Sequence, residues 1–297
     1  ICGFIDIVVK YDRRVGLFGK CIGYYGTVEA QGRGTLHCHM LLWVQGHPNP
    51  EWLRTMMIDD EHFKDLLFTW LEDLIKCELP GTTPDSVDLA ETNPAKPLDP
   101  HLQQPPQIAD LEEGAFLEAF QEFVHSLAIE CNWHEHTPTC FKHLHSGEVL
   151  GDETCHMQID GSMHMQSFLD PETQSIVLHQ LHPCVNNYND IVLFLLQCNM
   201  DIKFIGSGAA AKELTYYVSD YITKNDLQVH VGLQAIRATI DSHQKHFMND
   251  VESLSSVRKR NLLTKTVNAM MGRCEVSHQQ VMSYLIGGGD FYTAHVF

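Results

Sequence analysis

The stretch YGTVEAQGRGTLHCHMLLW, residues 25–43, joins two runs of β-branched, aromatic and aliphatic residues through Gly32-Arg33-Gly34. Residues that favour strands on both sides of a glycine-containing turn are typical of a β-hairpin. We therefore expect strands over residues 23–31 and 35–44, with the turn between them at residues 32–34. This hairpin determines how the candidate metal ligands Glu29, Gln31, His37 and His39 are arranged.

His37 and His39 lie two residues apart in the second strand of this hairpin. Strand side chains alternate between faces, so both imidazoles lie on one face, about 7 Å apart along the chain. A turn at residues 32–34 places Glu29 opposite His37, with Gln31 on the same face as Glu29. Two imidazoles and one such oxygen suit Mg²⁺ or Mn²⁺ as a Lewis acid on a phosphodiester, and also accept Zn²⁺. The alternative is a histidine pair that only forms hydrogen bonds.

Tyr217 and Tyr221 are four residues apart in a segment predicted to be helical from Ser207 to Lys224. At this spacing two side chains share one helix face, so both hydroxyls can point at the same site. A tyrosine hydroxyl, with a pKa of about 10, becomes a nucleophile when its proton is removed or a cation polarises the group that it attacks. The alternative is a pair of core-facing aromatic rings.

The composition indicates a globular chain that can bury a core, with 297 residues of which 44% are hydrophobic. No apolar run approaches the roughly 20 residues of a membrane-spanning helix, and no signal segment opens the chain. We therefore expect a soluble intracellular protein without a membrane partner. Ten cysteines beside 19 histidines favour reduced thiols over a disulfide scaffold. Because the chain opens on Ile1, we expect a segment of a longer protein.

The formal net charge of −18 argues against a general phosphate-binding surface, because affinity for nucleic acid usually rests on lysine and arginine. A local basic cluster is nevertheless present at Arg258, Lys259 and Arg260. Together with Arg33 in the hairpin turn, these residues are candidate phosphate contacts, and the alternative is that they are ordinary solvated charges.

The rest of the chain is predicted to be mostly helical. Seven of the twelve prolines lie between Pro80 and Pro106, so residues 79–110 are interpreted as an insertion with little regular structure. The other expected elements are a strand at 4–9, helices at 50–77, 111–128, 256–271 and 277–286, and a helix or buried strand at 191–197. Residues 131–164 form a Cys/His-rich segment without periodicity, dense enough for a structural Zn²⁺ site or simply a histidine-rich loop.

Residues 29–39 form the pattern Glu-x-Gln-x-Arg-Gly-x-x-His-x-His, which resembles a block of the Helitron replication-initiator domain. In that family the two histidines hold the metal. Tyr217, Tyr221 and Lys224 are similar to the two-tyrosine motif of the same domain, and the resemblance extends over nearly the whole chain. Residues 1–297 are therefore interpreted as one Helitron-like HUH endonuclease domain, with no helicase domain in this chain.

The resemblance implies an α+β fold with a ferredoxin-like HUH nuclease core: an antiparallel sheet of about five strands with helices packed on it, plus helical additions. It implies metal-dependent nicking and strand transfer of single-stranded DNA through a 5′-phosphotyrosine intermediate, in rolling-circle transposition. The catalytic residues would be Tyr217, Tyr221 and Lys224. The expected partners are single-stranded DNA and a helicase domain of the full-length protein, and the expected location is the nucleus.

His136, Cys140 and Cys155 occupy positions where this family tends to have cysteine or histidine, so they are the expected zinc ligands. Two alternatives to the nuclease remain open. The chain could be a catalytically inactive transposon remnant that only binds nucleic acid, which the acidic balance favours, or a zinc-stabilised interaction module.

Overall fold

A computed structural model describes residues 1–30, 35–89, 96–110, 112–141, 144–145, 147, 149–155, 159–223, 229–247, 255–273, 278–287, 289 and 291–295. Contacts within the chain define two compact units. Unit 1 comprises residues 1–9, 16–18 and 46–215, and unit 2 comprises residues 10–15, 19–45 and 216–297.

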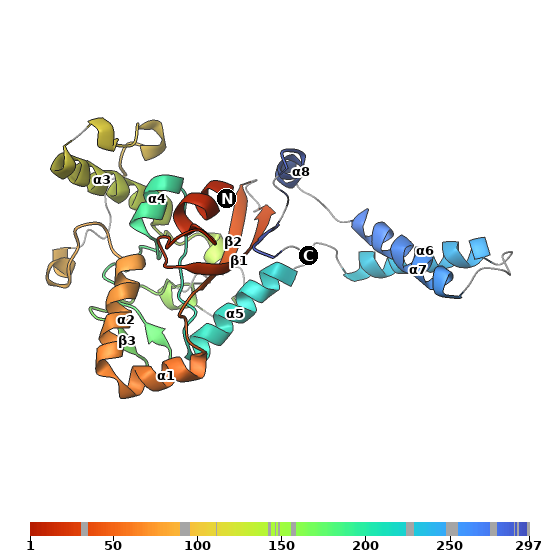
Figure 1. The fold of residues 1–297 in the computed structure, drawn as a ribbon, viewed down its shortest axis with the longest axis horizontal. Coiled ribbons are helices and arrows are strands. Elements are labelled where there is room, and N and C mark those ends of the chain that lie inside the picture. Colours follow the sequence, from red (N-terminus) through yellow and green to blue (C-terminus); the bar gives the residue numbers. More distant parts are fainter. Residues whose placement is uncertain are drawn as a thin grey trace. The chain divides into compact units, whose positions relative to one another are not determined.

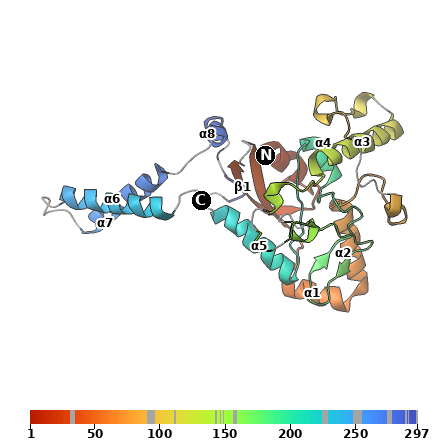
Figure 2. The ribbon, with the colours of Figure 1, turned by 180° about the vertical axis from the view of Figure 1, so that it is seen from behind.

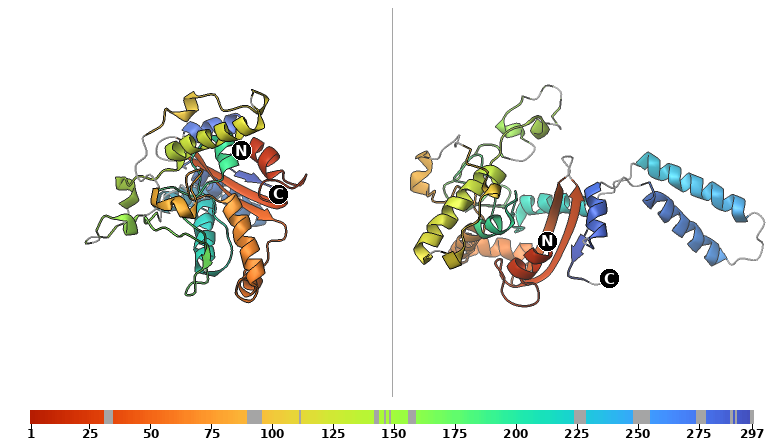
Figure 3. Two further views of the ribbon diagram at one scale, coloured as in Figure 1. Left: turned by 90° about the vertical axis from the view of Figure 1, so that its left-hand side faces the viewer. Right: turned by 90° about the horizontal axis from the view of Figure 1, so that it is seen from above.

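The main sheet of unit 2 is the expected hairpin with one added strand (Figure 1). Strand β1 (Cys21–Ala30) pairs antiparallel with β2 (Leu36–Val44), and β5 (Phe291–Thr293) pairs antiparallel with the other edge of β1. The right-hand view of Figure 3 shows β1 and β2 side by side over their length. The hairpin prediction is thus confirmed for both strands, while the turn at residues 32–34 lies outside the described residues.

The expected sheet of about five strands is not what the described residues form. They build this three-stranded sheet, in the order β2-β1-β5, and a separate two-stranded sheet of β3 (Phe168–Leu169) and β4 (Ile176–Val177) in unit 1. The fold is therefore mixed helix and sheet, as predicted. The five-strand expectation was wrong because two of the strands pair only with each other.

Residues 4–9 form a π-helical turn rather than the expected strand. Ile5, Val8 and Val9 are buried while Ile7 is 66% exposed, a spacing of three and four residues that belongs to a helix face. A short apolar run can form a strand or a helix, and at residues 4–9 the burial of one helical face favours the helix.

Two helices replace the single helix expected over residues 50–77. Helix α1 (Pro50–Asp59) ends and α2 (Glu61–Leu74) begins at Asp60, which is extended and accepts a hydrogen bond from Phe63 N at 3.0 Å. An aspartate that satisfies a free N–H of the first turn favours a helix start at that point. Leu53 and Met57 of α1 then pack with Phe68 of α2, and Leu169 of β3 and Ile176 of β4 lie against them.

The largest core of unit 1 lies between α3 (Glu113–Leu127) and α4 (Asp190–Leu196), which are adjacent in Figures 1 and 2. The buried residues of this core include Phe123, Val124 and Leu127 of α3 and Leu193 of α4. Beside them, the rings of Phe120 and Phe194 lie 4.9 Å apart between centroids. The structure confirms the helix expected near residues 111–128 and selects helix over strand for 191–197. Residues 79–110 contribute only short 3-10 turns in their described part.

Helix α5 (Gly208–Thr223) begins where the sequence predicted, at Ser207-Gly208. Gly208 has a φ of +84°, and a Cβ there would come within 2.5 Å of the Gln174 carbonyl oxygen, so this helix start requires glycine. Helices α7 (Ser255–Met271) and α8 (His278–Leu285) confirm the two helices expected near the end of the chain.

Helix α6 (Val229–Phe247) was not predicted, and it packs beside α7 in Figures 1 and 2. Its buried side is made of small residues, Gly232, Ala235 and Thr239, rather than large apolar ones. A search for large hydrophobic residues at helical spacing misses a helix of this kind. No helix in the described part of the chain is long and apolar enough to cross a membrane.

Asn189 connects two elements of unit 1 through a buried side chain that is 1% exposed. Its Oδ1 accepts a hydrogen bond from Val192 N at 3.0 Å and so caps α4, while its Nδ2 donates to the Leu74 carbonyl oxygen at 2.9 Å. The last carbonyls of a helix lack partners within that helix, so Asn189 satisfies one at the end of α2.

We predict that Asn189→Ala lowers the free energy of unfolding by about 2–4 kcal/mol, because it removes a cap and leaves a buried carbonyl without its partner. The matched control is Asn49→Ala, which removes the exposed cap of α1 and should cost only about 1 kcal/mol. Urea denaturation measures both values. Equal losses would contradict the role assigned to the Leu74 carbonyl.

His179, two residues after β4, contacts two carboxylates: Glu72 of α2 and Glu78 in the segment that follows α2. Its Nδ1 lies 3.1 Å from Glu72 Oε1 and its Nε2 lies 3.3 Å from Glu78 Oε2, and the imidazole is only 15% exposed. The hydrogen bond with Glu78 outweighs burial, and with the charges of Glu78 and Glu72 it raises the pKa of His179 above its usual value. The folded state therefore favours the imidazolium form.

A raised folded-state pKa gives stability that is complete below the unfolded histidine value of about 6.5 and is lost as pH rises through the folded value. We predict that the unfolding free energy of the wild type exceeds that of His179→Gln by more at pH 6 than at pH 8. Urea titrations at both pH values measure the difference. A gap between the two proteins that does not change with pH would refute the prediction.

Candidate functional site

The β1–β2 register brings Glu29 and the two histidines together in unit 2. Glu29 pairs with His37 and Thr27 pairs with His39, which is the arrangement expected for Glu29. The two imidazole rings lie 4.8 Å apart between centroids, and His39 Nε2 lies 3.4 Å from Glu29 Oε1. The His39 and Glu29 side chains are 12% and 26% exposed. Two imidazoles and one carboxylate thus share one half-buried face of the hairpin.

The contact between His39 Nε2 and Glu29 Oε1 has the length of a hydrogen bond. Imidazole nitrogen and carboxylate oxygen are donors that Mg²⁺ and Mn²⁺ sites in proteins also use. Gln31, the other expected ligand, and Arg33, the expected phosphate contact, lie outside the described residues.

The tyrosine pair is carried by α5, in which Tyr217 and Tyr221 are separated by one helical turn. Their side chains lie outside the described part of the structure, as does Lys224. Both tyrosines fall in unit 2, the unit that contains Glu29, His37 and His39. Of the basic cluster on α7, the Lys259 and Arg260 side chains are exposed, and the Arg258 side chain is outside the described part.

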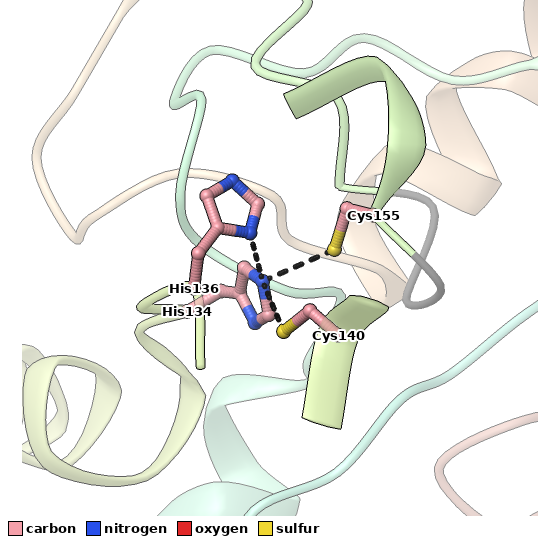
Figure 4. A group of neighbouring side chains, drawn as sticks. All are labelled: His134, His136, Cys140 and Cys155. Atoms are coloured by element: carbon pink, nitrogen blue, oxygen red, sulfur yellow. Dashed lines mark hydrogen bonds between the residues drawn. The ribbon is translucent and has the colours of Figure 1, made fainter. Parts of the chain in front are cut away.

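Four potential metal ligands meet in the Cys/His-rich segment of unit 1 (Figure 4). One ligand atom from each of His134, His136, Cys140 and Cys155 lies within 4.8 Å of all the others, so this cluster, the His/Cys tetrad, can hold a metal ion such as zinc. His134 was not among the expected ligands. Its signal in the sequence was the two-residue spacing from His136, which places two ligands on one side of an extended chain.

Other residues of this segment do not join the His/Cys tetrad. Cys131 Sγ lies 3.8 Å from His101 Nε2 instead, and His143 and His156 lie outside the described residues. The nine cysteines in the described part of the chain form no disulfide with one another, in line with the reduced thiols that the composition favours.

The pKa shifts within the His/Cys tetrad differ in direction: those of His134 and Cys140 favour the metal-binding form and that of His136 favours the protonated form. Burial, followed by the charge of His136, lowers the pKa of His134 and keeps its imidazole neutral. A hydrogen bond with Cys140 raises the pKa of His136, and Asp152 adds to this. Burial alone would raise the pKa of the Cys140 thiol, but hydrogen bonds from the Thr137 N–H and His136 outweigh it and lower that pKa. Neutral imidazole and thiolate are the forms that bind metal.

Comparison with known protein families gives one match, which covers the β1–β2 hairpin and the residues before it. Residues 3–42 match the family described as "Helitron helicase-like domain at N-terminus". This segment is Helitron-like. No curated protein and no solved structure matches the chain.

The Helitron-like segment contains Glu29, Gln31, Arg33, His37 and His39. The recognition made from the sequence pattern is therefore confirmed over the hairpin. Residues 43–297, with the tyrosine pair and the His/Cys tetrad, lie outside the matched segment, although the sequence resemblance was drawn over nearly the whole chain.

We predict that the Helitron-like hairpin binds Mn²⁺ and that His39→Ala or Glu29→Ala weakens this binding at least tenfold, or by about 1.4 kcal/mol. The physical reason is that each variant removes one partner of the Glu29–His39 contact, whose nitrogen and oxygen are proposed ligands. Titration calorimetry measures the affinity. His62→Ala, which removes an exposed histidine of α2, is the matched control and should bind as the wild type does. Unchanged affinity in His39→Ala would place the Mn²⁺ elsewhere.

Proposed function

We propose that this chain is the metal-dependent nicking and strand-transfer domain of a rolling-circle transposon protein, acting on single-stranded DNA. The observation that carries the proposal is the β1–β2 register, which sets Glu29 opposite His37 and within 3.4 Å of His39 Nε2. The Helitron-like match over the same hairpin supports it. A mixed nitrogen and oxygen donor set, together with two candidate tyrosine nucleophiles elsewhere in the chain, would suit cleavage of a phosphodiester.

In the proposed reaction, Glu29, His37 and His39, with Gln31, hold Mg²⁺ or Mn²⁺. The bound ion supplies Lewis-acid polarisation of the scissile phosphate. The Tyr217 or Tyr221 oxygen attacks the phosphorus, a tyrosine–phosphate bond forms at the 5′ end, and the 3′ oxygen leaves as a hydroxyl. Lys224, three residues after Tyr221, is assigned to stabilise charge at this step. The number of phosphoester bonds is conserved, so cleavage requires no nucleotide cofactor.

The charge distribution restricts where the DNA strand can bind. At a net charge of −18 the surface as a whole repels phosphate. We assign the strand to the local positive charge of Arg33 and of the α7 residues Arg258, Lys259 and Arg260, of which Lys259 and Arg260 have exposed side chains. A helicase domain of the full-length protein, in the nucleus, would supply the unwound strand.

We predict that the wild type, given Mn²⁺ and a pool of single-stranded oligonucleotides labelled at the 3′ end, forms a labelled covalent adduct on a denaturing gel. The label remains with the protein because the tyrosine keeps the 5′ phosphate of the downstream fragment. Tyr217→Phe and Tyr221→Phe rank the two nucleophiles, and the double variant should form no adduct. Tyr216→Phe, the neighbouring residue with a 78% exposed side chain, is the matched control and should retain the adduct.

The same pool labelled at the 5′ end should give a shortened free strand and no labelled protein. An adduct that persists in the Tyr217→Phe/Tyr221→Phe double variant would refute the nucleophile assignment. A folded, Mn²⁺-binding wild type that forms no adduct would favour the inactive remnant, in which the chain only binds nucleic acid.

A further inference from the structure

The hydrogen-bonding contacts of the His/Cys tetrad converge on a single ring nitrogen. His134 Nε2 lies 3.3 Å from Cys155 Sγ, 3.7 Å from Cys140 Sγ and 3.2 Å from His136 Nδ1 (Figure 4). A ring nitrogen carries at most one hydrogen, so it satisfies at most one of these three neighbours as a donor. Three electron-rich atoms directed at a fourth are better stabilised by a cation between them than by hydrogen bonds among themselves.

The three separations that involve His134 Nε2 are close to those of ligands around one tetrahedral ion. With Zn–N near 2.0–2.1 Å and Zn–S near 2.3 Å, tetrahedral geometry sets nitrogen atoms about 3.3 Å apart and nitrogen about 3.5 Å from sulfur. The nitrogen–nitrogen contact is 3.2 Å, and the nitrogen–sulfur contacts are 3.3 and 3.7 Å. Four protein ligands also leave no open position for water or substrate, which is the property of a structural site.

The surroundings of the tetrad orient its ligands. Asp152 Oδ1 lies 2.8 Å from His136 Nε2, so this carboxylate holds the outer ring nitrogen and leaves Nδ1 to face the cluster. A carboxylate behind a ligating histidine is the usual outer partner of a zinc site. On the sulfur side, the Thr137 N–H donates to Cys140 Sγ at 3.4 Å, which stabilises a thiolate.

The segment around the tetrad has little else to hold it. Among the described residues from 134 to 155, Cys140 and Cys155 are the buried hydrophobic residues, while Val149 and Leu150 are 79% and 67% exposed. At its start, His134 N donates to the Cys184 carbonyl oxygen at 2.7 Å, beside the core residue Val185. An ion at the tetrad would therefore attach a loop without an apolar core to the main core of unit 1.

We propose that His134, His136, Cys140 and Cys155 bind one structural Zn²⁺ ion, with Asp152 positioning His136, at a site separate from the Glu29, His37 and His39 cluster. Two thiolates and two imidazoles select zinc over Mg²⁺ and Mn²⁺, which prefer oxygen donors. The site belongs to unit 1 and the hairpin cluster to unit 2, so each can be tested without the other.

The test measures zinc by mass spectrometry in protein purified from zinc-supplemented cells. We expect about one zinc per chain, lost in Cys140→Ser and Cys155→Ser and retained in the His37→Ala/His39→Ala double variant. Cys184→Ser, which removes a thiol next to the His134 attachment but outside the tetrad, is the matched control and should retain zinc. Asp152→Asn should bind zinc about 10–100-fold more weakly.

Two measurements on the unaltered chain keep the proposal testable if a cysteine variant fails to fold. Cys140 and Cys155 should resist alkylation until a chelator removes the metal, and Co²⁺ in place of zinc should give the visible spectrum of a tetrahedral thiolate site. Folded wild type without zinc, or zinc lost only in His37→Ala/His39→Ala, would overturn the proposal. Failure of DNA nicking would not overturn the zinc proposal, because the zinc content and the DNA adduct are measured independently.

Discussion

The antiparallel pairing of β1 with β2 is the constraint on which the candidate active site depends. Side chains alternate along a strand, so a shift of one residue would turn His37 and His39 away from the face of Glu29 and bring Cys38 onto it. One register holds from Gly23 opposite Trp43 to Ala30 opposite Leu36, after an irregularity between Cys21 and Gly23. Backbone hydrogen bonds made over many residues therefore fix the position of three side chains at one end.

The chain carries two ligand clusters of different chemical character, and the difference gives each its role. Glu29, His37 and His39 offer no sulfur and sit on a half-buried strand face, which suits an ion that must also contact a phosphate. Cys140 and Cys155 are buried, and with two imidazoles they offer four ligands, the number that a closed structural zinc site uses. The roles proposed for the two clusters follow this difference: contact with a substrate for the first, and structural support for the second.

Sequence patterns predicted the hairpin and helices α3, α5 and α7, because each has a local preference that is uniform along its length. The sequence patterns failed at residues 4–9, where the apolar run is compatible with strand or helix and burial of one helical face selects the helix. They also failed at α6, because this helix buries small residues such as Gly232 and Ala235. Residues 136, 140 and 155 of the His/Cys tetrad were expected from the family resemblance, whereas His134 was not, although it lies two residues from His136. Strand β5 has only three residues, too few for any periodicity.

The sheet that carries the histidines joins segments that lie far apart in the sequence, since Thr27 of β1 pairs with Phe291 of β5. During synthesis on the ribosome, all the residues between β1 and β5 must emerge before this edge of β1 receives its partner. Until then the strand presents unpaired N–H and C=O groups to any other extended segment, which is the condition that invites misassembly between nascent chains. Correct formation of the sheet therefore depends on how quickly β5 follows β1 out of the ribosome, or on a chaperone that covers the open edge meanwhile.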